Sequence, residues 1–182
     1  GDLDIKLVYD DDSLFTRRGA DPNWIKNARN AVVISGKKDP MLGEECGYWG
    51  EKLVIYAQTL GLNTCWITGT YNKKAAKAMI PDKHKFCAVI AIGYGTDAGT
   101  PHKGKTREDV MKVEGEAPEW FLKGIDYALL APTAANAQNF MFTLEGTRVG
   151  LESTKGPEPE IDLGIVKYHF EIGAERRNFT WK

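Results

Sequence analysis

One stretch of the chain combines a proline, small residues and amide side chains in a way that could hold a ligand against the backbone. Residues 131–140 contain Pro132, Asn136 and Gln138 and directly follow the apolar run 120–130. A proline at this point makes continuation of a helix unfavourable. The small residues let the backbone approach a flat group, and the two amides supply donors and acceptors there. The plainer interpretation is a helix end and a turn before the next strand, and the sequence leaves both open.

A second candidate site is a pair of basic side chains. Lys105 and Arg107 stand one residue apart, shortly after the apolar run 89–92. A lysine supplies a point charge and an arginine supplies a planar fork of donors, a combination that suits a phosphate group. The alternative is a solvated, charged surface turn, which is common after a strand.

Catalytic side chains with a defined spacing are absent from the sequence. It contains no G-x-S-x-G elbow, no P-loop and no H-E-x-x-H motif, and its three histidines are isolated from one another. His169 falls on the last expected helix, where we interpret it as a histidine with satisfied hydrogen bonds rather than as a catalytic group. We therefore expect no catalytic residue.

The cysteines argue against a metal site. Cys46, Cys65 and Cys87 stand far apart and have no zinc-type spacing. An odd and sparse set of cysteines suits a reducing cytosol, so we expect a cytoplasmic protein. Each cysteine lies in an apolar run, which predicts three buried, unreactive thiols.

Composition limits the class of protein. The chain has 182 residues, of which 42% are hydrophobic, and a net charge of −1. This length fits a single domain, residues 1–182, with a sizeable core. The balance of charge offers no electrostatic basis for binding nucleic acid or an anionic membrane. The apolar runs are too short to span a bilayer.

Helices and strands alternate along the chain. Periodicity and turn signals predict strands at 4–9, 31–35, 64–67, 87–92, 140–144, 148–151 and 179–181, and helices at 44–60, 73–79, 118–130 and 162–174. Asp162 is placed to cap the last helix. The pattern predicts an α/β (α+β) fold with one mixed central sheet flanked by helices.

Several segments together resemble one protein family. They are residues 131–138, residues 47–53 continuing to 60–66, residues 89–94 followed by 105–107, and residues 162–174. They resemble the nitroreductase family, flavoproteins that bind FMN. The Ala-Pro-Thr segment follows the Cys-Trp segment here, an order that is similar to the thermophile-type branch of that family. The resemblance implies a nitroreductase-like fold.

The resemblance also implies where FMN would bind. It places Lys105 and Arg107 at the phosphate. The residues implied at the ring or ribityl chain are Pro132, Thr133, Ala134, Asn136 and Gln138. The residues whose backbone is implied to run beside the ring, with an N–H near N5, are Trp66, Ile67, Thr68 and Gly69. A buried strand followed by a glycine turn is the alternative for this last segment.

By resemblance, the chain would be an NAD(P)H oxidoreductase that reduces nitroaromatics, quinones or similar small acceptors by ping-pong hydride transfer through flavin N5. The alternatives are another flavin chemistry, such as reductive dehalogenation, or an FMN-binding or structural protein without turnover. The family also implies a homodimer with flavin at the interface. The large aromatics Trp49, Trp120, Phe121 and Trp181 would supply interface surface, or would simply form the core.

One family feature is not found. Nitroreductases commonly begin with an Arg-x-Ser-x-Arg arm that grips the flavin phosphate. Arg17 and Arg18 follow Ser13 in the wrong order and spacing for it. We therefore expect the domain to lack this arm and to bind FMN weakly.

Overall fold

The computed structural model describes residues 2–16, 25–97, 99–155 and 160–182, so Arg17 and Arg18 lie outside the described residues. The chain divides into two compact units. The first comprises residues 1–46 and 52–99, and the second comprises residues 47–51 and 100–182. Helix α1 (Leu42–Thr59) therefore contributes to both units.

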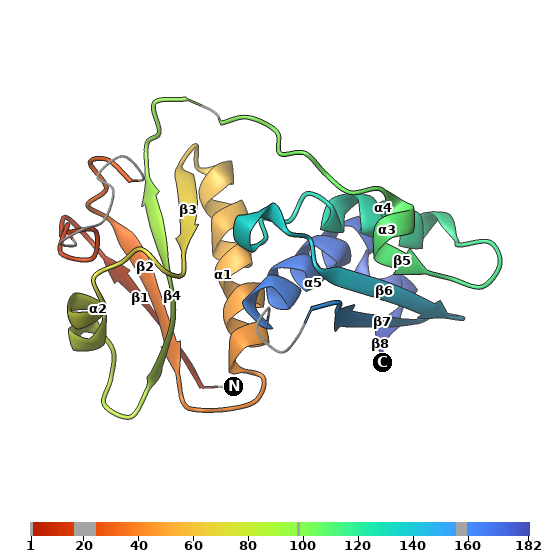
Figure 1. Cartoon of the computed structure of the whole chain (residues 1–182), viewed down its shortest axis with the longest axis horizontal. Helices are drawn as coiled ribbons and strands as arrows, with labels where there is room; N and C mark the ends of the chain where they lie inside the picture. Colours follow the sequence, from red (N-terminus) through yellow and green to blue (C-terminus); the bar gives the residue numbers. More distant parts are fainter. Residues whose placement is uncertain (1, 17–24, 98, 156–159) are drawn as a thin grey trace. The chain divides into compact units, whose positions relative to one another are not determined.

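The first unit is built on an antiparallel sheet with the order β1-β2-β4-β3. Its strands are β1 (Leu3–Val8), β2 (Ala31–Gly36), β3 (Asn63–Ile67) and β4 (Lys85–Gly93). Helix α2 (Lys73–Met79) covers one face and α1 lies over the other (Figure 1). Because both faces are covered, every residue of β2 is buried, as its continuous apolar run predicts.

The core of this unit lies under α2. Val33, Ile67, Val89 and Ala91 project from the sheet and pack with Ala76 of the helix. The helix begins at this place because the Asn72 side chain accepts hydrogen bonds from the N–H groups of Lys74 and Ala75.

The second unit has its own four-stranded sheet, in the order β5-β6-β7-β8. Its strands are β5 (Met111–Lys112), β6 (Phe140–Glu145), β7 (Arg148–Ser153) and β8 (Thr180–Trp181). Its helices are α3 (Arg107–Val110), α4 (Glu119–Ala128) and α5 (Glu160–Ala174), with short 3-10 turns η1 (Ala134–Asn136) and η2 (Arg176–Asn178). The antiparallel hairpin β6–β7 is confirmed, and β5 and β8 pair with it in parallel.

Aromatic side chains form the core of the second unit. Phe142 and Phe170 stack with ring centroids 4.7 Å apart, and Phe121 meets both edge-on. Trp120 stacks on Phe179 at 5.8 Å. Phe121 is therefore core, whereas Trp120 is half-buried at the edge of the same ring cluster, and its part in an interface remains a prediction.

The sequence and the structure agree on the α/β class and differ on the sheet. The expected single mixed sheet is two sheets, one antiparallel and one mixed. Both edges of β4 are occupied, by β2 and β3. The hairpin β6–β7 instead pairs with β5, which precedes it in the chain, and with β8, which follows it. Within the part of the chain that the structure describes, no helix combines the length and the apolar character needed to cross a membrane.

Candidate functional site

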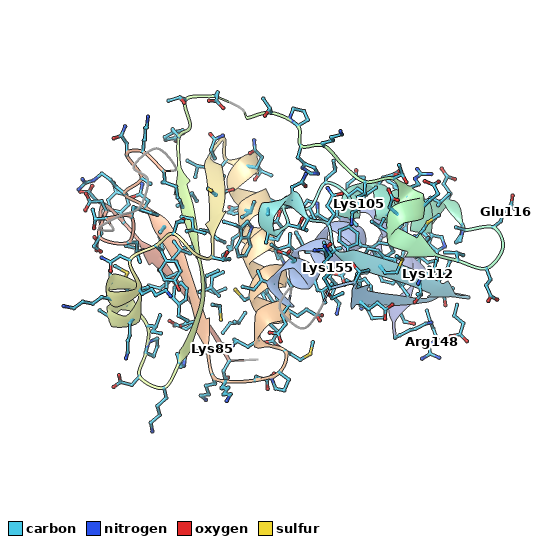
Figure 2. The ribbon with its side chains drawn as sticks, viewed as in Figure 1. Lys85, Lys105, Lys112, Glu116, Arg148 and Lys155 are labelled. Atoms are coloured by element: carbon cyan, nitrogen blue, oxygen red, sulfur yellow. The ribbon has the colours of Figure 1, made fainter. Side chains whose placement is uncertain are left out.

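Hydrogen bonds join two of the segments that the sequence singled out, which lie 33 residues apart. The backbone N–H of Lys105 donates to Gln138 Oε1 at 2.7 Å, and Lys105 Nζ donates to the Gln138 carbonyl oxygen at 2.8 Å. Figure 2 labels Lys105. Asn136 Nδ2 donates to the Lys103 carbonyl oxygen at 2.8 Å. The basic segment and the amide-bearing turn therefore form one site in the second unit.

The turn is also bonded within itself. The Gln138 N–H donates to Thr133 Oγ1, and Gln138 Nε2 donates to Asn136 Oδ1, both at 3.0 Å. Gln138 is only 1% exposed, so its amide must find partners inside the protein. Gln138 holds the turn in shape, whereas Pro132, Ala134, Asn136 and Lys105 present the exposed surface.

The backbone of this turn adopts an uncommon conformation. Ala135, Asn136 and Gln138 have φ angles of 52°, 53° and 48°, in the left-handed region that side chains other than glycine disfavour. Each such residue costs on the order of 1 kcal/mol, and such residues gather at functional sites. The hydrogen bonds described above hold the turn in this shape, so the positions of its exposed residues are fixed by the protein before any ligand binds.

Asp162 supports the turn from α5. The Ala134 N–H donates to both of its carboxylate oxygens at 3.1 Å. Asp162 lies in the first turn of α5, which begins at Glu160, so the expectation that it caps this helix is wrong. Burial raises the pKa of Asp162, and the hydrogen bond from Ala134 offsets part of that rise.

We expect Asp162→Asn to change how stability depends on pH. A raised pKa means that the folded state holds this proton more tightly than the unfolded chain, where Asp titrates near pH 4. The parent should therefore lose stability as pH rises from about 4 through the folded pKa, and Asp162→Asn, which keeps an oxygen for Ala134, should not. Urea unfolding across this pH range measures the difference.

The control for this prediction is Asp109. Hydrogen bonds from Thr106 lower the pKa of Asp109, so its contribution to stability is present above the unfolded pKa and is lost as pH falls. Asp109→Asn should thus change the profile in the opposite sense. Superimposable pH profiles for the parent and Asp162→Asn would contradict the prediction.

Arg107 is engaged with a carboxylate. Its Nε and Nη2 donate to the two oxygens of Asp126 in α4, at 2.6 and 2.5 Å. A phosphate at this position would compete with Asp126 for the same fork of donors. Among the described residues, the Lys105 ammonium donates one hydrogen bond, to the Gln138 carbonyl oxygen, so it has further donors available for an anion.

The residues from Trp66 to Gly69 belong to the first unit. Ile67 is 3% exposed in the core under α2, so only its backbone could meet a ligand. Thr68 and Gly69 are exposed, and a Cβ at Gly69 would meet no described atom within 4 Å. A flat group could approach here, but the site that joins these residues to the turn remains a prediction.

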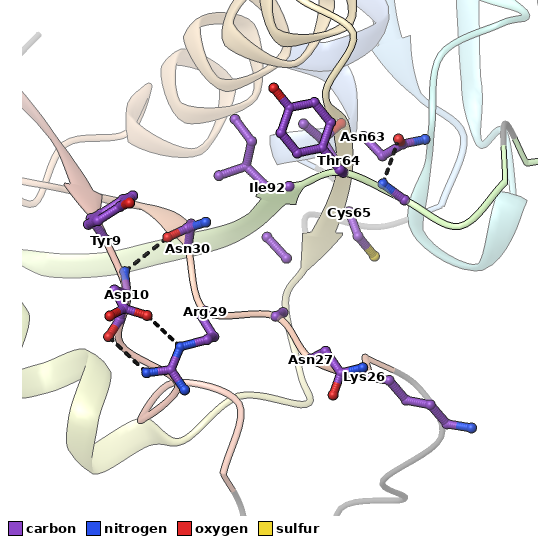
Figure 3. Close-up of a pocket in the computed structure, with 15 residues that line it drawn as sticks. Tyr9, Asp10, Lys26, Asn27, Arg29, Asn30, Asn63, Thr64, Cys65 and Ile92 are labelled. Carbon is purple, nitrogen blue, oxygen red and sulfur yellow. Dashed lines mark hydrogen bonds and ion pairs between the residues drawn. The ribbon is translucent and has the colours of Figure 1, made fainter.

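The sequence did not anticipate a cavity of about 480 Å³ in the first unit (Figure 3). Arg29, which pairs with Asp10, and Asn63 and Cys65 line it together with other residues. It lies at the opposite end of β3 from Gly69, and no residue implied at the flavin lines it. Cys65 is exposed there and Cys87 is half-buried, so the expectation that all three cysteines are buried is confirmed only for Cys46.

His169 forms a buried pair with Glu51. Nε2 of His169 lies 2.8 Å from Glu51 Oε1, and Nδ1 lies 3.2 Å from the Tyr127 carbonyl oxygen. Both ring nitrogens have partners, which confirms the interpretation of a satisfied helical histidine. Glu51 was not singled out, because nothing in its local sequence distinguishes a buried glutamate from an exposed one. Among the described residues, no three acidic, cysteine or histidine side chains gather as a metal site would require.

Comparison with solved structures identifies the fold. A putative nitroreductase from Thermotoga maritima is 22% identical, with a TM-score of 0.65 over 90% of this chain and 69% of that chain. An FMN-dependent nitroreductase from Clostridium difficile is 22% identical over 56% of this chain and 68% of its own, with a TM-score of 0.45. A putative nitroreductase in complex with FMN, from Desulfovibrio desulfuricans, is 20% identical over 64% and 74%, with a TM-score of 0.49.

No curated protein matches the chain. The family described as "Putative TM nitroreductase" matches residues 1–174, which is nearly the whole sequence. This match agrees with the four segments that resemble nitroreductases and with the fold shared with the Thermotoga maritima protein. The chain therefore belongs to the Putative TM nitroreductase family.

Proposed function

We propose that the chain binds FMN non-covalently and acts as an NAD(P)H oxidoreductase on small electron-poor acceptors such as nitroaromatics or quinones. The observation that carries this proposal is the family match over residues 1–174. The rigid turn that the structure shows at the expected flavin segment supports it, since its conformation has a cost that function would explain.

The residues of the second unit fit part of FMN. The Lys105 ammonium is exposed and has donors available for the phosphate. Pro132 and Ala134 offer exposed surface without long side chains, beside which a ring or ribityl chain can lie, and Asn136 is exposed at the same place. Arg107 fits less well, because its fork already binds Asp126. We therefore assign the larger share of phosphate binding to Lys105.

The first unit would contribute backbone rather than side chains. Trp66, Ile67, Thr68 and Gly69 are proposed to run beside the ring, with Gly69 allowing close approach. FMN, when bound, supplies the hydride chemistry, so no side chain need act as an acid or a base. The protein would position the group and tune its charge. A homodimer with flavin at its interface is part of this proposal, and light scattering on the flavin-loaded protein tests it.

An absorbance spectrum of the purified protein with added FMN tests the proposed function most directly. A saturable change in the absorbance or fluorescence of the added FMN on titration with the protein separates a flavoprotein, even one that binds weakly, from a structural protein. Anaerobic addition of NADH or NADPH should then bleach the flavin band, and a nitroaromatic or quinone should restore it. A bound flavin that neither nicotinamide reduces would show a flavin carrier or another flavin chemistry instead.

We expect Lys105→Ala to weaken FMN about 10- to 100-fold and to leave riboflavin almost unaffected. Charge-assisted hydrogen bonds contribute about 1.5–3 kcal/mol each, and riboflavin has no phosphate to receive them. Arg107→Ala should have a smaller effect, because Arg107 must leave Asp126 to reach a phosphate. Fluorescence titration of both ligands measures these differences, with Lys103→Ala as the matched control. Equal losses for FMN and riboflavin would refute the assignment of Lys105 to the phosphate.

A further inference from the structure

A bulge in β4 sets the direction of one cysteine. The pairing of β2 with β4 passes from Ile34 opposite Ala88 to Ser35 opposite Phe86, so Cys87 is the extra residue inserted between the two pairs. Regular alternation would place Cys87 on the same face as Val89, which packs under α2. A bulge re-aims a side chain in this way, and here it turns Cys87 toward the face that α1 covers.

Helix α1 brings a second cysteine, Cys46, to the height of Cys87 along β4. Its first residue, Leu42, lies against Gly36, where an added Cβ would meet Leu42 Cδ1 at 2.5 Å. Gly36 is paired with Lys85. One turn further along the helix, Cys46 has advanced about 6 Å, and the two strand residues from Lys85 to Cys87 span about 6.8 Å. The helix and the strand thus advance by similar distances from the contact between Leu42 and Gly36, which brings Cys46 to the level of Cys87.

Cys46 and Cys87 differ in access to solvent. An interaction with Cys87, together with burial, raises the pKa of the Cys46 thiol well above its ordinary value. Cys87 Sγ itself donates to the Lys85 carbonyl oxygen at 3.7 Å. Cys46 is completely buried, whereas Cys87 is half-buried. Neither is in a disulfide. Cys87 is therefore the sulfur that a small oxidant can reach, and Cys46 is the thiol held against it.

We propose that Cys46 and Cys87 form a redox pair, a modification site at which a hydroperoxide such as hydrogen peroxide closes a reversible disulfide between α1 and β4. The proposal is independent of flavin binding, because none of the residues proposed to hold FMN takes part. Cys65 is exposed elsewhere in the same unit and serves as an internal reference for an ordinary surface thiol.

The chemistry balances in two steps. The Cys87 thiolate attacks one peroxide oxygen, so that an S–O bond forms, the O–O bond breaks and the departing hydroxide takes the thiol proton as water. The Cys46 sulfur then attacks Cys87 sulfur, forming the S–S bond and displacing the second oxygen, which leaves as water with the Cys46 proton. Two thiols and one hydrogen peroxide give one disulfide and two waters, and a dithiol reductant reverses the change.

Peptide mapping of the oxidised full-length protein tests the proposal. The protein is treated with hydrogen peroxide, blocked with an alkylating agent and digested without reduction. A peptide pair linked through Cys46 and Cys87, lost after dithiothreitol, is the expected result in both the parent and Cys65→Ser. If Cys46 and Cys87 are alkylated as thiols under conditions that fully oxidise Cys65, the proposal is overturned.

Variants separate the two roles. Cys46→Ala should stop the reaction at Cys87 sulfenic acid, which dimedone traps, and Cys87→Ala should leave Cys46 as an unmodified thiol. Closing a long loop also constrains the unfolded chain, so the oxidised parent should melt at a higher temperature than the reduced parent, with no such shift in either variant. Dimedone labelling of Cys46 in preference to Cys87 would contradict the assigned order, and equal melting temperatures for the two redox forms of the parent would contradict the link.

Discussion

His169→Leu should lower the free energy of unfolding by about 3–5 kcal/mol, because it removes the imidazole from a buried carboxylate. Glu51 is 1% exposed and its Oε1 lies 2.8 Å from His169 Nε2. Leucine fills the space of the ring but has no polar atom to meet Glu51 Oε1, and losing a polar contact in the interior is destabilising. Urea unfolding followed by tryptophan fluorescence measures the change.

Two comparisons distinguish this loss from a general effect of replacing histidine. His102 is exposed and, among the residues that the structure describes, bonds the Leu129 carbonyl oxygen, so His102→Leu should cost less than about 1 kcal/mol. The double variant Glu51→Leu/His169→Leu should recover much of the lost stability, because neither partner is then left in the interior. A His169→Leu protein as stable as the parent would show that the pair contributes little.

Gly47→Ala is expected to destabilise the second unit by about 3 kcal/mol, although alanine is the better helix former. A Cβ at Gly47 would lie 2.0 Å from the Ile161 carbonyl oxygen and 3.0 Å from the Ile165 nitrogen. Both are backbone atoms of α5, which cannot turn aside as a flexible side chain can. The gain in helix propensity is only about 1 kcal/mol, so the steric cost decides the sign.

Gly93→Ala is the matched control for Gly47→Ala. A Cβ at Gly93 would meet no described atom within 4 Å, so this change should stay within about 0.5 kcal/mol of the parent. Thermal and urea unfolding of the two variants provide the comparison. Stabilisation by Gly47→Ala would mean that α1 and α5 can separate without loss, contrary to the contact seen here.

Local signals were sufficient to predict most of the elements. The continuous apolar run at 31–35 is β2, the apolar stripe at 44–60 is α1, and the turn Glu145-Gly146-Thr147 separates the two strands of the predicted hairpin. Each of these depends on a few neighbouring residues, because periodicity, caps and turn residues act within one or two turns of chain. The predicted ends differ from the observed ones by a few residues.

The candidate site was predicted as separate pieces. Lys105, Asn136 and Gln138 were each singled out from the sequence, but their mutual hydrogen bonds were not, because they connect positions 33 residues apart. Two roles changed as a result. Gln138 is buried and holds the turn, and Arg107 binds Asp126, a partner that no local pattern indicates.

The sequence by itself determined the α/β class, the positions of most of the helices and strands, and the family, since these depend on local pattern and on short motifs. Only the tertiary structure decided that the strands form two sheets, that Glu51 meets His169, and that the register between β2 and β4 shifts beside Cys87. The physical reason is that pairing between distant segments depends on which edges and faces remain open once the local elements have packed. A one-residue shift in a strand moves a side chain to the other face without changing any local signal.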